Sequence, residues 1–162
     1  MTESFVKTKI AGSIAAGALD EVNNIIKPGV STLEIDKLCY NYINDHKAFS
    51  APLYYRGYPK SCCTSSNHVV CHGIPSEKIL NDGDILNVDV TAIKDGWHGD
   101  TSRMFVVGEC SVKAKKLIKT TYVAMMEAIK IIKANTKIGN IGHTIQKIVE
   151  AEGFSVVRDF CG

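Results

Sequence analysis

The clearest structural signal in the chain is Ile85–Gly108, which reads I-L-N-V-D-V-T-A-I-K-D-G-W-H-G-D-T-S-R-M-F-V-V-G. Two β-rich apolar runs, Ile85–Ile93 and Trp97–Val107, flank the dipeptide Asp95-Gly96. Asp-Gly is a strong signal for a two-residue hairpin turn, because both central residues of that turn need a positive φ. The stretch therefore predicts an antiparallel β-hairpin.

The register of this hairpin divides its side chains between two faces. With Asp95 and Gly96 in the turn, Lys94 lies opposite Trp97 and successive residues alternate between the faces. The face that we expect in the core carries Leu86, Val88, Val90 and Ala92. The other face carries Asn87, Asp89, Thr91, His98, Asp100 and Ser102.

Two acids on the polar face, Asp89 and Asp100, are expected as diagonal neighbours, with their Cβ atoms about 7 Å apart. Carboxylates at that separation repel each other, and one of them would normally stay protonated. A pair of divalent cations removes the conflict, and sites with two metals commonly catalyse hydrolysis. The alternative is a solvated face of an antiparallel sheet, on which acids need no function. The hairpin alone leaves both interpretations open.

Size and composition are those of one globular domain: 162 residues, 45% hydrophobic and 22% charged. A net charge of +2 gives no argument for nucleic acid, so no DNA partner is expected. No apolar run approaches the roughly 20 residues that cross a bilayer, so no membrane association is expected. The N-terminus lacks the order of a signal peptide, which predicts a cytoplasmic protein. The six cysteines form no C-x-x-C pair and are interpreted as reduced thiols.

Apolar residues at helical spacing predict four helices. Their expected ranges are 4–27, 31–46, 111–133 and 141–152. Ser31 and Glu34 form a capping-box signature at the start of the second helix, and Gly153 is expected to end the fourth. The residues expected to point inward from the third helix are Leu117, Ile118, Tyr122, Met125, Ile129 and Ile132. Residues 61–71 and 154–160 are predicted as strands.

The segment 49–59 is aromatic and irregular, with Tyr54, Tyr55 and Tyr58 close together. Their amphipathic rings suit the mouth of a pocket, although a loop held on the core by its rings is an equal alternative. His72 precedes Gly73 at the predicted end of a strand and can present its imidazole to a cleft. A histidine in a turn more often has no such role.

A weak internal repeat appears when the chain is shifted by 106 residues, which aligns Ile25–Lys27 with Ile131–Lys133. A long helix, a breaker, a short helix and an extended segment then occur twice. We expect a single domain that contains a first pseudo-repeat of about residues 1–110 and the start of a second at about 111–162. The divalent cations considered for Asp89 and Asp100 take four to six ligands each, so these two aspartates need further ligands from elsewhere.

Several blocks resemble, in order, the signature blocks of the type I methionine aminopeptidases. They are K-S-C-C-T-S-S-N-H-V-V-C-H-G-I-P, D-G-D-I-L-N-V-D-V-T, D-G-W-H-G-D-T-S-R-M-F-V-V-G and E-A-E-G-F-S-V-V-R-D-F-C-G. The resemblance covers essentially the whole chain. It implies an α/β (α+β) fold of the pita-bread type with pseudo-twofold halves. It also implies a metalloaminopeptidase that removes the initiator methionine when the second residue is small.

The resemblance implies roles for eight residues. Asp89 and Asp100 correspond to ligands of two divalent ions (cobalt, manganese, iron or zinc), and Asp100 would bridge them. His72 corresponds to the catalytic histidine that hydrogen-bonds the substrate near the scissile amide. The residues implied to line the pocket for the methionine side chain are Tyr55, Tyr58 and Cys63. The residues whose backbone carbonyls are implied to hold a monovalent cation are Asn67 and Val69.

The family takes its other ligands, a histidine and two glutamates, from the second half, and the histidine follows directly after the C-G with which this sequence closes. The sequence thus resembles an N-terminal portion, and by itself it is expected to bind metals weakly and hydrolyse nothing. The implied substrate is the N-terminal methionine of nascent polypeptides, and the resemblance allows a transient ribosome contact and a monomeric complete enzyme. Alternatives of the same fold are a prolidase, a metal-free creatinase and a non-catalytic binding module. Such modules generally lose the acidic ligands.

Overall fold

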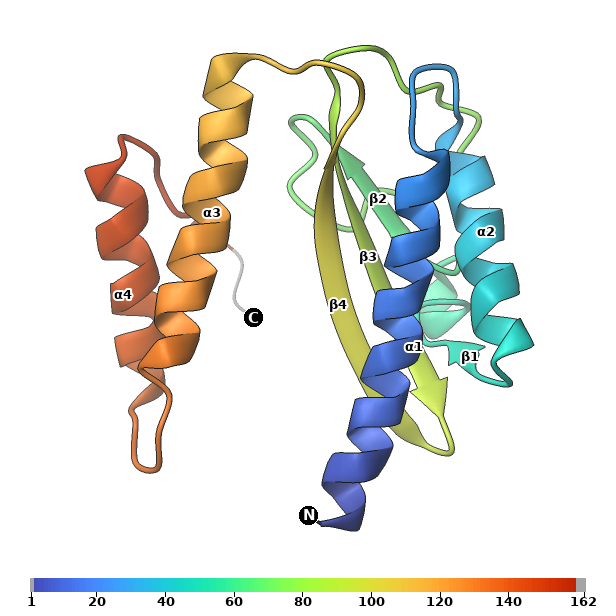
Figure 1. Ribbon diagram of the computed structural model, residues 1–162, viewed down its shortest axis with the longest axis horizontal. Coiled ribbons are helices and arrows are strands. Elements are labelled where there is room, and N and C mark those ends of the chain that lie inside the picture. Colours follow the sequence, from blue (N-terminus) through green and yellow to red (C-terminus); the bar gives the residue numbers. More distant parts are fainter. Residues whose placement is uncertain (1, 160–162) are drawn as a thin grey trace. The chain divides into compact units, whose positions relative to one another are not determined.

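The computed structural model describes residues 2–159 and divides into two compact units, residues 1–110 and residues 111–162. The elements of the first unit are α1 (Glu3–Ile25), α2 (Thr32–Asp45), β1 (Phe49–Ser50), the 3-10 turn η1 (Tyr55–Gly57), β2 (Cys63–Ser66), β3 (Ile85–Lys94) and β4 (Trp97–Val106). The elements of the second unit are α3 (Val112–Lys130) and α4 (Ile138–Ala151). All of them are labelled in Figure 1 except η1.

The predicted hairpin and its register are confirmed. Asp95 and Gly96 have φ of 51° and 81°, and Lys94 lies opposite Trp97. The second strand ends at Val106, one residue earlier than expected. β3 is the central strand of an antiparallel sheet, since β1 and β2 both pair with it along one edge and β4 pairs along the other.

Helices α1 and α2 cover one face of this sheet (Figure 1). All four residues expected on the core face, Leu86, Val88, Val90 and Ala92, have no exposed surface. They pack in one cluster with Leu19 and Val22 of α1 and Ile35 and Ile43 of α2. This burial of large apolar side chains is the main source of stability in the first unit.

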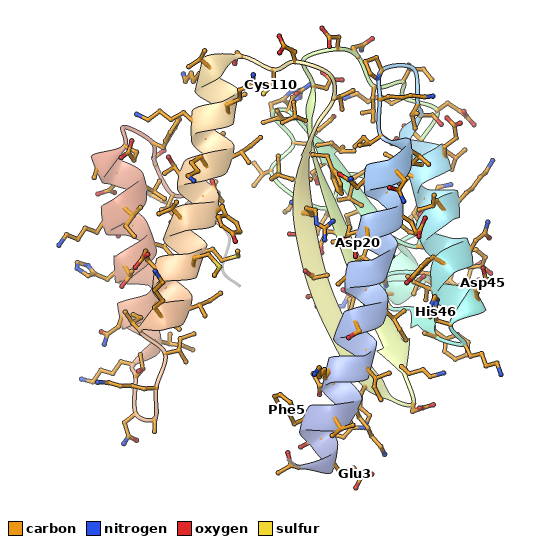
Figure 2. All side chains as sticks on the ribbon, viewed as in Figure 1. Glu3, Phe5, Asp20, Asp45, His46 and Cys110 are labelled. Atoms are coloured by element: carbon orange, nitrogen blue, oxygen red, sulfur yellow. The ribbon has the colours of Figure 1, made fainter. Side chains whose placement is uncertain are left out.

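α1 lies close against β4, and two features explain this approach. A Cβ atom at Gly99 would overlap the backbone of Ala11 and Gly12, so only glycine fits there. At the other end of the contact, Nη1 of Arg103 on β4 lies 2.9 Å from Oδ1 of Asp20, which is labelled on α1 in Figure 2. The pair is solvent-exposed, and the packing contributes more than the charge.

The predicted capping box at the start of α2 is confirmed. The Ser31 hydroxyl accepts the Glu34 N–H at 3.2 Å, and Glu34 Oε2 accepts the Ser31 N–H at 2.7 Å. Two of the otherwise unpaired N–H groups near the helix start are thereby satisfied.

The strand predicted for residues 61–71 is wrong in length, because β2 covers only Cys63–Ser66. Asn67 then adopts a φ of 54° and Val69 donates its N–H to the Ser66 carbonyl, which turns the chain. The chain comes back beside β2, where the Thr64 N–H donates to the Gly73 carbonyl at 2.8 Å. Because asparagine tolerates a left-handed φ, the strand ends here although apolar residues follow.

The second unit consists of α3 and α4 packed against each other. Ser111 caps α3 as predicted, and Gly153 follows α4 with a φ of 79°. The inward face predicted for α3 is wrong. The buried residues are Thr120, Ala124 and Ala128, whereas Leu117, Tyr122, Met125, Ile129 and Ile132 are exposed and Ile118 is half-buried. The residues that α3 buries are small, and its larger apolar residues remain uncovered within this unit.

The strand predicted for residues 154–160 is also wrong over the residues that the structure describes. Residues 154–159 form no strand, and Phe160 lies outside the described residues. Residues 111–159 contain no other strand that could provide hydrogen bonds for it. Each unit holds a longer helix followed by a shorter one, but the pseudo-repeat itself stays a prediction. Within residues 2–159, no helix combines the length and the apolar character that a bilayer crossing requires.

Candidate active site

A cleft of about 800 Å³ opens on the polar face of the sheet in the first unit. Its floor comes from β3 and β4, and its walls come from the aromatic loop around η1 and from the turn at residues 72–74. Six of the eight predicted site residues line it: Tyr55, Tyr58, Cys63, His72, Asp89 and Asp100. The predicted face of the hairpin also contributes Thr91 and His98.

Asp89 and Asp100 are diagonal neighbours across the hairpin, as predicted, because Asp100 lies opposite Thr91 and Asp89 lies opposite Ser102. The Thr91 hydroxyl donates to Asp100 Oδ1 at 3.0 Å, which orients that carboxylate. Burial, followed by the negative charge of Asp100, raises the pKa of Asp89, while the nearby His72 acts in the opposite direction. Without a cation the pair resists carrying two charges.

Cys63 lies directly opposite Asp89 in the sheet register, and it is 8% exposed. Burial raises the pKa of the Cys63 thiol, the nearby Tyr58 hydroxyl lowers it, and the charges of Asp89 and Asp100 add to the increase. The preceding Cys62 is fully buried in the core cluster, so the two adjacent thiols point to opposite faces, as expected.

His72 has a φ of 54°, and the geometry of the next residue explains its position. A Cβ atom at Gly73 would overlap the Thr64 carbonyl, so glycine is needed where this turn lies against β2. The Gly73 N–H donates to the Ser65 hydroxyl at 3.1 Å. These contacts hold the His72 imidazole at the edge of the cleft that contains Asp89.

The aromatic loop forms the opposite wall. The Tyr58 hydroxyl lies 3.0 Å from the Cys62 carbonyl and 3.1 Å from the Gly73 carbonyl, and it can donate to either. Burial is the main cause of a strongly raised pKa at Tyr58, so the phenol remains a donor. Tyr55 is 65% exposed at the rim, and Tyr54, 80% exposed, does not line the cleft.

Asn67 and Val69 do not line this cleft. The Asn67 side chain donates to Asp84 Oδ1 at 2.8 Å and accepts the Ile85 N–H at 3.1 Å, at the start of β3. Their predicted role toward a monovalent cation stays a prediction.

Sequence reasoning did not single out Arg56, which also lines the cleft, 5.5 Å from the centroid of the Tyr55 ring. Its position depends on a left-handed φ of 49° that no sequence pattern indicated. Ile74, which follows the turn at His72 and also lines the cleft, was not predicted either.

The residues of the cleft fit part of a metal centre. Carboxylate oxygens suit divalent ions, and the mutual repulsion of the two acids favours a cation between them. Among residues 2–159, however, no cluster of three or more His, Cys, Asp and Glu side chains could hold a metal ion. The two aspartates thus provide an incomplete ligand set.

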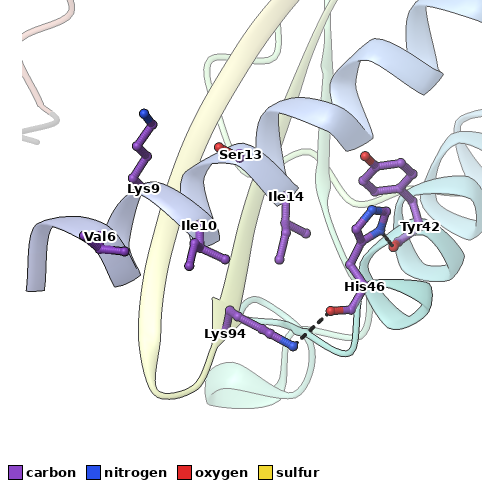
Figure 3. Close-up of a pocket in the computed structure, with 8 residues that line it drawn as sticks. All are labelled: Val6, Lys9, Ile10, Ser13, Ile14, Tyr42, His46 and Lys94. Atoms are coloured by element: carbon purple, nitrogen blue, oxygen red, sulfur yellow. Dashed lines mark hydrogen bonds between the residues drawn. The ribbon is translucent and has the colours of Figure 1, made fainter. Parts of the chain in front are cut away.

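A second hollow of about 620 Å³ lies between α1, the end of α2 and the end of β3 (Figure 3). There the Lys94 ammonium donates to the His46 carbonyl at 3.1 Å. The residues that line it are Val6, Lys9, Ile10, Ser13, Ile14, Tyr42, His46 and Lys94. None of these is an acid or a thiol, so the hollow lacks the chemistry of the cleft.

Residues 6–162 match the metallopeptidase family M24, and the chain belongs to this family. It is 51% identical, over 160 residues, to the methionine aminopeptidase of Rickettsia prowazekii (strain Madrid E), with 99% of this chain and 62% of that protein covered. The crystal structure of methionine aminopeptidase from Rickettsia prowazekii has a TM-score of 0.96 at 52% identity, covering 99% of this chain and 65% of that one. The chain therefore spans less than two thirds of the length of these relatives.

The fold class expected from the sequence, the α/β pita-bread fold, is confirmed by these comparisons. The Xaa-Pro dipeptidase from Bacillus anthracis has the same fold, with a TM-score of 0.82 at 22% identity over 94% of this chain and 42% of that one. At this identity the similarity concerns the fold alone. Membership of the M24 family also implies divalent metal ions as cofactors.

Proposed function

We propose that this chain carries the substrate pocket and two metal ligands of a metalloaminopeptidase that removes the initiator methionine from nascent polypeptides. The observation that carries the proposal is that two neighbouring carboxylates, an imidazole and a pocket of tyrosines with a thiol share one cleft. The relatives named methionine aminopeptidase support the same activity.

Asp89 and Asp100 would hold two divalent ions. Cobalt, manganese, iron and zinc all suit carboxylate ligands. When bound, such ions supply Lewis-acid activation of water and of the scissile carbonyl. The remaining ligands would come from residues other than these, because the two aspartates are an incomplete set.

The other residues of the cleft would bind and orient the substrate. His72 would hydrogen-bond the substrate near the scissile amide and stabilise the charge that develops there. Tyr55, Tyr58 and Cys63 would surround an unbranched thioether, which makes favourable contacts with aromatic rings. A small second residue would be preferred.

The substrate would be the N-terminal methionine of new chains, met in the cytoplasm during a transient contact with the ribosome, and the complete enzyme would act as a monomer. The carbonyls of Asn67 and Val69 would hold a monovalent cation, away from the cleft. The two units would be the first pseudo-repeat and the beginning of the second.

Metal binding tests the ligand assignment. Titration calorimetry of this chain with Mn²⁺ should detect binding that weakens at least about tenfold in Asp89→Asn and in Asp100→Asn. The matched control is Asp95→Asn, in the exposed turn of the same hairpin, where asparagine tolerates the observed φ of 51°. Equal Mn²⁺ affinity in all four proteins would contradict the assignment.

Peptide hydrolysis tests the activity. The chain alone should not cleave Met-Ala-Ser, whereas a chimera with the C-terminal part of a methionine aminopeptidase relative should cleave it. An X-Pro dipeptide in the same assay separates the prolidase alternative. A chimera that folds and cleaves only the X-Pro dipeptide would refute the methionine assignment.

A further inference from the structure

One buried acid of the first unit does not line the cleft. Asp36 on α2 is 7% exposed, and its Oδ1 atom has four donors, one of which is the Cys62 thiol at 3.7 Å. It accepts the Ser61 N–H at 2.8 Å, the Ser61 hydroxyl at 2.6 Å and the Cys62 N–H at 3.2 Å. A buried carboxylate needs such donors to offset the cost of leaving water, and hydrogen bonds to a charged acceptor are the stronger kind.

The segment held by Asp36 leads directly into the cleft. The Cys62 carbonyl lies 3.0 Å from the Tyr58 hydroxyl, which also reaches the Gly73 carbonyl at 3.1 Å. The next residue, Cys63, begins β2 and faces Asp89. The backbone of Ser61 and Cys62 is therefore the junction between the aromatic loop, the first residue of β2 and the turn that follows His72.

We propose that Asp36 is a positioning residue of the methionine pocket. Its carboxylate fixes the backbone of Ser61 and Cys62 from the side of α2. That backbone sets how deeply the Cys63 side chain lies in the cleft. Through the Cys62 carbonyl, it also sets the position of the Tyr58 ring. The identity of the bound side chain rests on the proposed function, but the coupling of Asp36 to the cleft does not.

The structure provides a matched control for a role limited to helix stability. Glu34 lies on the same helix, two residues before Asp36, and its carboxylate bonds to Ser31 at the cap. Loss of either acid weakens α2 or its packing, but only Asp36 contacts the junction behind the cleft. A general loss of stability and a loss of positioning therefore predict different results for Glu34→Gln and Asp36→Ala.

The reporter is the rate at which iodoacetamide alkylates Cys63 in this chain, followed residue by residue by mass spectrometry. Cys39, fully buried on α2, reports the opening of the core in the same sample. Asp36→Ala should raise the ratio of the Cys63 rate to the Cys39 rate by about tenfold, since several hydrogen bonds to a charged acceptor are lost. Ser61→Ala, which removes one of them, should raise it less, and Glu34→Gln should leave it unchanged.

Protection by L-methionine links the pocket to the proposed function. In the unmodified chain L-methionine should slow the alkylation of Cys63, and Asp36→Ala should raise the concentration needed for half protection.

A Cys63 to Cys39 ratio that is the same in the unmodified chain, Asp36→Ala and Ser61→Ala would overturn the inference. If Asp36→Ala does not fold, the Cys63 to Cys39 ratios of Asp36→Asn and Ser61→Ala test the inference in its place. If L-methionine does not protect Cys63 in the unmodified chain, the methionine pocket fails, while the ratio still decides the role of Asp36.

Discussion

The two units bury different kinds of side chain. In the first unit, leucines, isoleucines and valines from two helices meet the apolar face of the sheet and lose nearly all exposure. In the second unit, α3 buries Thr120, Ala124 and Ala128, while Tyr122, Met125 and Ile129 remain 55%, 46% and 51% exposed. An apolar stripe on a helix therefore indicates which face can be buried, whereas burial itself requires a neighbouring surface.

The largest contrast is expected from large-to-small substitutions. Leu86→Ala should lower the free energy of unfolding of the first unit by about 2–5 kcal/mol, because it leaves a cavity in a closed core. Ile129→Ala should change the stability of the second unit by less than about 0.5 kcal/mol, since the side chain is half exposed. Urea denaturation measures both. Similar losses for the two variants would mean that the exposed face of α3 is covered in solution.

Glycine substitutions should differ in sign between the units. Gly99→Ala should cost about 1–3 kcal/mol, because its Cβ would overlap the backbone of α1. Gly139→Ala in α4 should instead stabilise the helix by up to about 1 kcal/mol, because a Cβ there meets nothing within 4 Å and alanine has the higher helix propensity. Thermal unfolding followed by circular dichroism compares them. A stabilising Gly99→Ala would disprove the close approach of α1 and β4.

Helix caps offer a smaller and reciprocal test. α2 begins with the Ser31 cap, and Ser31→Ala should lower stability by about 0.5–2 kcal/mol. Lys137 occupies the N-cap position of α4 and provides no side-chain hydrogen bond there, so Lys137→Ser should raise stability by about 0.5–1 kcal/mol. Denaturant midpoints give both values. No gain in Lys137→Ser would indicate that the start of α4 is held by other contacts.

The smallest expected effects are those of pH, and two acids of the first unit should act with opposite sign. Hydrogen bonds from Ser31 lower the pKa of Glu34 in the folded chain, so its contribution to stability is present above the unfolded value of 4.5 and is lost as pH falls through the folded pKa. Burial and then Asp100 raise the pKa of Asp89, so its contribution is full below 3.8 and is lost as pH rises through the folded pKa. In metal-free buffer, Glu34→Gln should thus destabilise and Asp89→Asn should stabilise at neutral pH, and both differences should shrink toward pH 3. Free energies of unfolding measured at several pH values check the sign expected for each acid. Destabilisation by Asp89→Asn at neutral pH would contradict the sign expected for Asp89.

The sequence predicted the parts of the fold that depend on neighbours along the chain. The Asp95-Gly96 turn determined the register of the hairpin, and the alternation of side chains then assigned Leu86 to the core and Asp89 to the polar face. The capping box at Ser31 was equally local. The length of the strand at residues 61–71 was predicted wrongly, because a single left-handed φ at Asn67 ended it.

The candidate site also combines features that local sequence predicts with features that it does not. The acids of the hairpin were brought together by local geometry, and the aromatic loop and His72 were expected beside them only from the family resemblance. The support behind the cleft was not foreseen at all. Asp36 lies 25 residues from Ser61 in sequence, and no periodicity connects them.

Local sequence was sufficient to specify the hairpin, its two faces and the approach of two carboxylates, because a two-residue turn and the alternation of side chains leave one register that buries the valines. Contacts formed in the folded chain specify which face of α3 is covered, where β2 ends and which buried acid lies behind the cleft. These features depend on contacts between segments far apart in sequence. The identity of an apolar or acidic residue does not indicate which distant residue it will contact.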